Sequence, residues 1–221
     1  MDLLQAMRER HSVRVYTPQP IEGEVLQNLK QYIDQCNRES GLHIQLILNE
    51  PQAFSGRMAH YGKFSGVRNY IALVGNKGAN LDEKLGYFGE KIVLMAQTLG
   101  LNTCWVALTY SKSKAAHTLD KNEKCVLVIA IGYGATAGTA HRGKTAEQVM
   151  RAAENPPQWF QNGINAALLA PTAMNQQKFT FSLNGKKVTA KAGTGFYTKV
   201  DLGIAKAHFE LGAGKENFTW G

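Results

Sequence analysis

The sequence contains few cysteines, and their positions exclude two classes of protein. Among its 221 residues there are three cysteines, Cys36, Cys104 and Cys125, which lie far apart and show no paired spacing. This pattern argues against a disulfide framework and against a cysteine-based zinc site. The six histidines also show no pairing with carboxylates at metal-ligand spacing along the chain, so the sequence predicts no metal site.

Long apolar runs are also missing. No stretch approaches the roughly 20 residues that are needed to cross a bilayer, so we expect no membrane partner. Residues 1–8 lack the basic start and the apolar centre of a signal peptide, and we therefore expect a cytoplasmic protein. A dinucleotide-binding fingerprint is absent too, because no Gly-x-Gly-x-x-Gly sequence follows an expected strand.

Acidic residues are outnumbered by basic ones. The chain has 25 Lys and Arg against 17 Asp and Glu, which gives a net charge of +8. Such a surface attracts anions in general. One interpretation of the positive charge is a protein that binds nucleic acid. However, the basic residues are scattered and no nucleic-acid-binding motif occurs. An anionic cofactor and a phosphorylated cosubstrate explain part of the charge equally well, and we predict no nucleic-acid partner.

The hydrophobic periodicity predicts an α+β protein. Residues 50–69 have little periodicity, and we expect either a loop that covers a ligand or an ordinary surface excursion there. The segments with helical spacing lie at 3–9, 22–37, 81–99, 146–153, 158–169 and 197–211. The segments typical of strands lie at 43–48, 70–75, 102–108, 125–132, 178–183, 186–192 and 218–220.

Two arginines and a serine lie within five residues near the N-terminus, in the sequence Arg10-His11-Ser12-Val13-Arg14. A guanidinium group offers planar, forked donors that match phosphate oxygens, and the serine hydroxyl adds another donor. This stretch, called the clasp below, therefore predicts a grip on the phosphate of a mononucleotide. The alternative is a set of solvated side chains, since charged groups mostly stay exposed.

A second stretch carries a further motif. Residues 169–179 read Leu-Ala-Pro-Thr-Ala-Met-Asn-Gln-Gln-Lys-Phe. Together with the clasp, this stretch resembles the FMN-dependent nitroreductase family, which has an Arg-Arg/His-Ser-x-Arg/Lys clasp and an Ala-Pro-Ser-x-x-Asn-x-Gln-Pro-Trp-like segment. Thr172 stands where Ser is usual, and Lys178-Phe179 where Pro-Trp is usual. The order differs more, because the family places the second motif soon after the clasp and here it follows about 160 residues later.

The order of expected elements in the first part of the chain is repeated in outline in the second. The family resembled forms homodimers in which one subunit supplies the clasp and the other supplies the proline segment. We therefore expect a nitroreductase-like fold of two related halves, residues 1–150 and 151–221. Each half would have an antiparallel-type sheet with flanking helices, and the two would pack as a pseudo-dimer with one intact flavin site. Such a chain is expected to be a monomer or a homodimer.

The resemblance also implies which residues bind FMN. The clasp would hold the phosphate and the ribityl chain or the ring edge, a late basic pair would reach the same phosphate, and the proline segment would lie along the flavin. A backbone N–H near the end of the strand at 102–108 would face the reactive flavin nitrogen. The expected FMN-binding residues are Arg10, His11, Ser12, Arg14, Ala107, Arg142, Lys144, Pro171, Thr172, Ala173, Met174 and Asn175. For the basic pair the alternative is a solvated linker, and for Asn175 it is turn formation.

The resemblance implies an FMN-dependent NAD(P)H oxidoreductase. In that family NAD(P)H reduces FMN, which then reduces a nitroaromatic, a quinone or a similar acceptor in a ping-pong reaction. The cofactor carries the redox chemistry, so no catalytic acid–base residue is predicted. The alternative function is a flavin-binding storage or sensor protein with little turnover.

Overall fold

The computed structural model describes residues 1–140, 142–152 and 155–221. Contacts divide the chain into two compact units, which are described separately. The clasp unit comprises Arg10–Leu81 and Ile92–Ala140, and the C-terminal unit comprises Met1–Glu9, Asp82–Lys91 and His141–Gly221. The division into halves at residue 150 stays a prediction, since these units are discontinuous along the chain.

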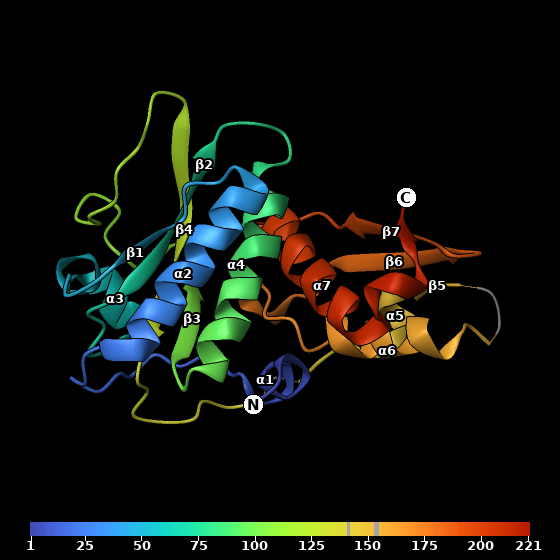
Figure 1. Cartoon of the computed structure of the whole chain (residues 1–221), viewed down its shortest axis with the longest axis horizontal. Helices are drawn as coiled ribbons and strands as arrows, with labels where there is room; N and C mark the ends of the chain where they lie inside the picture. The colour runs from blue at the N-terminus through green and yellow to red at the C-terminus, as the bar shows by residue number, and fades with distance from the viewer. Residues whose placement is uncertain (141, 153–154) are drawn as a thin grey trace. The chain divides into compact units, whose positions relative to one another are not determined.

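The clasp unit is built on a four-stranded antiparallel sheet (Figure 1). Its strands are β1 (Gln45–Ile47), β2 (Tyr70–Asn76), β3 (Asn102–Val106) and β4 (Glu123–Gly132), in the order β1-β2-β4-β3. Helix α2 (Gly23–Ser40) lies over one face of this sheet (Figure 1). Residues 92–98 of helix α4 (Leu81–Thr98) also belong to this unit.

The opposite face of the sheet is covered by residues 50–69, the segment with little periodicity in the sequence. This segment contains the short helices η1 (Gln52–Phe54) and α3 (Arg57–Tyr61). Side chains alternate along a strand, and Tyr70 of β2 packs in one buried cluster with Phe54 and Phe64. The rings of Phe54 and Phe64 meet edge to face at 5.3 Å between centroids. Residues 50–69 are therefore anchored by buried aromatic side chains.

The C-terminal unit contains a second four-stranded sheet, in the order β5-β6-β7-β8 (Figure 1). The central pair β6–β7 is antiparallel, and the outer pairs β5–β6 and β7–β8 are parallel. The strands are β5 (Met150–Arg151), β6 (Phe179–Asn184), β7 (Lys187–Ala192) and β8 (Thr219–Trp220). The helices are α1 (Leu3–Glu9), α5 (Ala146–Val149), α6 (Gln158–Ala167), η2 (Ala173–Asn175), α7 (Thr198–Ala213) and η3 (Lys215–Asn217), with residues 82–91 of α4.

The helix predicted for residues 146–153 is shorter in the structure. It ends at Val149, and Met150 pairs instead with Phe181 as the first residue of β5. Backbone pairing with β6 thus replaces the continuation of the helix. The last part of that prediction, Ala153, lies outside the described residues.

Aromatic rings fill the core of the C-terminal unit. Phe181 of β6 stacks on Phe209 of α7 with 4.7 Å between ring centroids, and Phe160 of α6 meets Phe209 edge to face at 5.6 Å. Phe160, Phe181 and Phe209 are all fully buried. Burial of such rings contributes strongly to the stability of this unit.

Two glycines let helices α4 and α7 cross at very short range within the C-terminal unit. A Cβ on Gly86 of α4 would collide with the backbone carbonyl of Val200, and a Cβ on Gly203 of α7 would collide with that of Glu83. Each glycine lies five residues after the first residue of its helix, and each contacts the residue two places after the start of the other. The two helices therefore contact each other through residues at equivalent positions in α4 and α7.

The predicted fold class, α+β with sheets and flanking helices, is confirmed. None of the described helices is both long enough and apolar enough to cross a membrane.

Candidate functional site

The clasp is held in the clasp unit by main-chain pairing on both sides. The N–H of Val13 donates to the carbonyl of Thr103 in β3 at 3.0 Å, and Ser12 and Thr103 form a parallel bridge. Further along, Tyr16 pairs with Gly134 after β4. The side chains of the clasp consequently emerge from a fixed backbone.

The charged side chains of the clasp differ in exposure. Arg10 is buried, with 4% of its surface exposed, and Arg14 is exposed. The guanidinium of Arg14 lies 5.9 Å from the ring centroid of Phe64, a cation–π contact that orients it. A buried guanidinium is costly unless negative charge or polar partners surround it, so the surroundings of Arg10 have to compensate its charge.

Three clasp side chains influence the thiol of Cys104 in β3. Burial raises the pKa of this thiol, while the charge of Arg14, a hydrogen bond with Ser12 and the charge of Arg10 act to lower the same pKa. The two guanidinium charges and the hydroxyl expected to grip a phosphate therefore all act on the same buried thiol.

A glycine lies directly against the clasp. Gly138 has a φ of +76°, and a Cβ there would come within 2.8 Å of the His11 Cβ and 3.1 Å of the Ser12 carbonyl oxygen. A residue with a side chain is disfavoured in this left-handed conformation as well. The chain after β4 can thus pass close to the clasp backbone only with glycine at this position.

Ala107 lies in the same unit. It is half-buried and follows Val106, the last residue of β3. Because Ser12 pairs with Thr103 of that strand, the clasp and Ala107 are linked through β3. The expected residues Arg10, His11, Ser12, Arg14 and Ala107 therefore form one group in the clasp unit.

The other expected residues form a second group, in the C-terminal unit. The side-chain amide of Asn175 donates to the carbonyl of Arg142 at 2.6 Å. The ammonium of Lys144 donates to the carbonyl of Gln177 at 2.8 Å, and its backbone N–H donates to the Gln177 side chain at 2.6 Å. Arg142 is thus joined by a hydrogen bond to Asn175 of the proline segment, residues 171–175, and Lys144 is joined to Gln177 just after that segment.

The proline segment and the residues directly after it have an unusual backbone. Met174, Asn175 and Gln177 have φ values of 51°, 53° and 44°, in the left-handed region that residues with side chains rarely adopt. Met174 is 98% exposed at the tip. Strain of this kind persists only where the surroundings enforce it, and it is concentrated at functional sites.

Asp201 of α7, which no sequence pattern indicated, binds two residues that flank this strained stretch. Its carboxylate accepts the N–H of Ala173 at 2.9 Å and the side-chain amide of Gln176 at 2.7 Å. Burial raises the pKa of Asp201 to about 6, against the opposing effect of these two hydrogen bonds. An acidic residue in the first turn of a helix is usually explained by its favourable interaction with the helix dipole. The sequence therefore does not indicate the contact of Asp201 with Ala173 and Gln176.

A family model and solved structures of other proteins resemble this chain. The family model described as "Putative TM nitroreductase" matches residues 2–213. A Thermotoga maritima protein described as a "putative nitroreductase" is 21% identical, with a TM-score of 0.70 over 98% of this chain and 85% of that one. No curated protein sequence matches the chain significantly.

Two shorter structures match about two thirds of the chain. One, from Desulfovibrio desulfuricans, is described as a "putative nitroreductase in complex with FMN"; it is 21% identical, with a TM-score of 0.53, over 67% of this chain and 95% of that one. The other is a nitroreductase family protein of Streptococcus pneumoniae that is 13% identical, with a TM-score of 0.53, over 68% of this chain and 99% of that one. At these identities the structures establish a common fold.

Proposed function

Because the chain belongs to the family described as "Putative TM nitroreductase", we propose that it is an FMN-dependent oxidoreductase. The observation that carries this proposal is the placement of Arg10, Ser12 and Arg14 on a stretch of backbone that pairs with β3 in the clasp unit. Similarity to a structure described as a complex with FMN supports the choice of cofactor.

The donor set of the clasp fits the phosphate of FMN. Arg10 and Arg14 carry two positive charges, and the phosphate carries close to two negative charges at neutral pH. Ser12 adds a hydroxyl donor beside them. The main-chain pairing of Val13 with β3 keeps these donors in place before the ligand arrives, which lowers the entropy lost on binding.

FMN, when bound, supplies the redox chemistry. The chain's own residues bind and orient it: the clasp takes the phosphate end, and a backbone N–H near Ala107 is the proposed donor to the ring. Arg142, Lys144 and the residues of the proline segment remain predicted FMN contacts, each open to its own substitution test. The proposed electron donor is NAD(P)H, and the proposed acceptor is a nitroaromatic or a quinone. The two would react in turn by a ping-pong mechanism.

We further propose that the chain is an internal pseudo-dimer with one flavin per chain. The symmetric crossing of α4 and α7 through Gly86 and Gly203 supports this, because a two-fold axis between two helices repeats each contact at the equivalent position of the partner. Leu85-Gly86 in α4 and Leu202-Gly203 in α7 are also identical pairs at equivalent positions.

The test of the clasp is Arg10→Ala, with Arg38→Ala as the matched control. Arg38 is an exposed arginine near the end of α2 in the same unit. Loss of a charge-assisted phosphate contact costs about 1.5–3 kcal/mol, so the dissociation constant of FMN should rise at least tenfold in Arg10→Ala and stay unchanged in the control. An equal FMN affinity in both variants would remove the assigned role.

Turnover is tested on the flavin-loaded protein under anaerobic conditions. Loss of the oxidised-flavin absorbance on adding NADH or NADPH, and its return on adding a quinone, is the expected result for an oxidoreductase. Stable yellow colour in the presence of both reductants would instead favour a flavin storage or sensor protein.

A further inference from the structure

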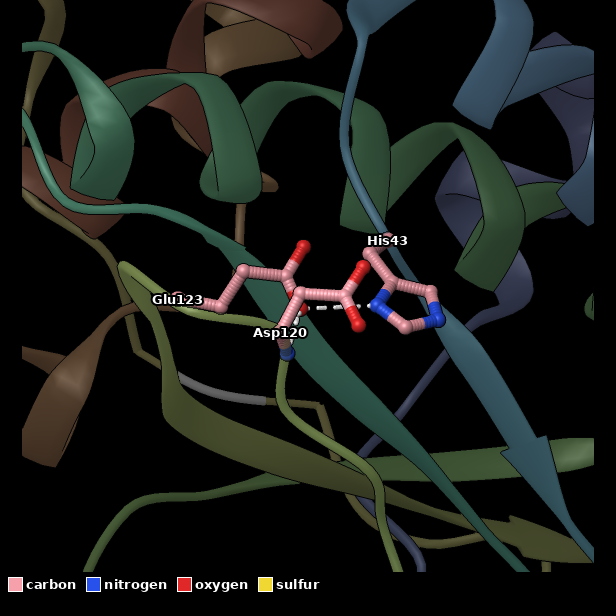
Figure 2. Close-up of side chains that lie close together, drawn as sticks. All are labelled: His43, Asp120 and Glu123. Atoms are coloured by element: carbon pink, nitrogen blue, oxygen red, sulfur yellow. Dashed lines mark hydrogen bonds and ion pairs between the residues drawn. The ribbon is translucent and has the colours of Figure 1, made fainter.

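Three side chains that sequence spacing did not connect meet at one edge of the clasp unit. His43 lies just before β1, whereas Asp120 lies in the turn before β4 and Glu123 is the first residue of β4. Nδ1 of His43 is 2.8 Å from Oε2 of Glu123, which lies 80 residues later in the chain. The ligand atoms of all three residues lie within 4.8 Å of one another, and Figure 2 shows the three side chains pointing toward a common point.

Main-chain contacts hold the ligand-bearing segments in place. The N–H of His43 donates to the carbonyl of Val74 in β2 at 3.0 Å. The N–H of Asp120 donates to Oε2 of Glu123 at 2.8 Å, and the N–H of Glu123 donates back to the Asp120 carbonyl at 3.0 Å. The turn is therefore closed on itself, and the backbone that carries the two carboxylates is held in place.

A side chain of β1 also fixes this turn to the strand that follows His43. Gln45 accepts the N–H of Thr118 at 2.9 Å and donates to the Thr118 carbonyl at 2.8 Å. Both segments are thus connected near the cluster by contacts that do not use the cluster's own side chains. Pre-positioned ligands are what a metal ion needs for tight binding.

We propose that His43, Asp120 and Glu123 form a binding site for a divalent transition-metal ion such as Zn²⁺. One imidazole nitrogen and two carboxylate oxygens suit Zn²⁺, Mn²⁺ or Fe²⁺, whereas Mg²⁺ and Ca²⁺ prefer oxygen ligands alone and Cu⁺ prefers sulfur. Three protein ligands leave one position of a tetrahedral ion for water.

The geometry requires only a small rearrangement. With bonds of about 2.1 Å, tetrahedral ligand atoms lie roughly 3.4 Å apart, between the 2.8 Å of the His43–Glu123 contact and the 4.8 Å limit of the cluster. The carboxylate of Glu123 has two oxygens, so one can bind the ion while the other keeps the Asp120 N–H. His43 and Asp120 are accessible to solvent, which gives the ion a path of entry.

Binding at this site would tie the start of β1 to the start of β4. Since the unfolded chain does not hold these residues together, an ion bound by the native state stabilises it in proportion to occupancy. The site is independent of the clasp chemistry and of the proposed FMN-dependent activity.

The experiment is equilibrium dialysis of the untagged, chelator-treated protein against ZnCl₂, with bound zinc measured by elemental analysis. The variants are His43→Gln and Asp120→Asn, and the control is His60→Gln, which alters an exposed histidine of α3 in the same unit. Thermal unfolding with and without ZnCl₂ provides a second readout on each protein.

We expect one bound zinc per chain at micromolar free zinc, with the dissociation constant raised at least tenfold in both site variants and unchanged in His60→Gln. Zinc should also raise the unfolding temperature of the unaltered protein and of His60→Gln, but not that of the site variants. No bound zinc at 1 mM free zinc, or binding equal in all four proteins, would overturn the proposal.

Discussion

The two regions expected to contact FMN are positioned by different means. The clasp lies on a backbone paired with β3, so its side chains can change without moving the chain. The proline segment has a strained backbone, and the buried carboxylate of Asp201 accepts hydrogen bonds from Ala173 and Gln176 within this stretch. The first arrangement should tolerate substitution, and the second should respond to pH and to any change in its support.

The largest effect on stability is expected from a substitution at the crossing of helices α4 and α7, next to Asp201. Val200, the residue before Asp201, presents its carbonyl to Gly86. Gly86→Val would place a side chain where backbone atoms now lie, and overpacking that cannot relax costs roughly 3 kcal/mol or more. Denaturant unfolding should show this loss in Gly86→Val but not in Gly78→Val, where nothing lies near the added Cβ. Equal stability of the two variants would mean that the helices do not cross in this way.

The next effect concerns the pH dependence of stability. The pKa of Asp201 is about 6 in the folded chain and 3.8 in the unfolded one, so the folded state binds the proton more tightly. Its contribution to stability is complete below about pH 4 and is lost as the pH rises through 6. Two pKa units correspond to about 3 kcal/mol at most.

Asp201→Asn should remove this dependence. The difference in unfolding free energy between the variant and the unaltered protein should therefore shift in favour of the variant between pH 4 and pH 7. The control Asp34→Asn changes an exposed carboxylate of α2 and should give a flat difference. A flat difference for Asp201→Asn as well would contradict the raised pKa.

The smallest effect is expected in the clasp itself. Ser12→Ala removes one neutral donor, worth about 0.5–1.5 kcal/mol of FMN binding, while the backbone pairing with Thr103 stays. FMN affinity should fall only a few-fold, less than in Arg10→Ala, and the unfolding midpoint should stay nearly constant. Ser12→Thr keeps the hydroxyl and should bind FMN more tightly than Ser12→Ala. A large loss of stability in Ser12→Ala would show that the clasp depends on its side chains.

The sequence predicted most of the elements because their signals are local. Helix α4 and strand β4, for example, appear as long apolar segments and lie within two residues of the predicted limits. The prediction of helix beyond Val149 was wrong because pairing of Met150 with Phe181 depends on a strand about 30 residues away.

The contacts that matter most for the proposed sites were outside the reach of sequence patterns. Asp201 holds Ala173 from another element, and His43 meets Glu123 across 80 residues. Neither pair has a spacing that one helix or hairpin would produce. The basic pair Arg142 and Lys144 was predicted from a family resemblance, and the structure adds the hydrogen bonds of this pair to Asn175 and Gln177.

The most direct test of the account is the amount of flavin per chain. The purified protein, saturated with FMN and freed of excess ligand, is denatured, and the released flavin is measured against protein concentration. The account predicts a yellow protein with close to one FMN per chain. Two FMN per chain would contradict the single-site pseudo-dimer, and a colourless protein that does not take up FMN would contradict the proposed function itself.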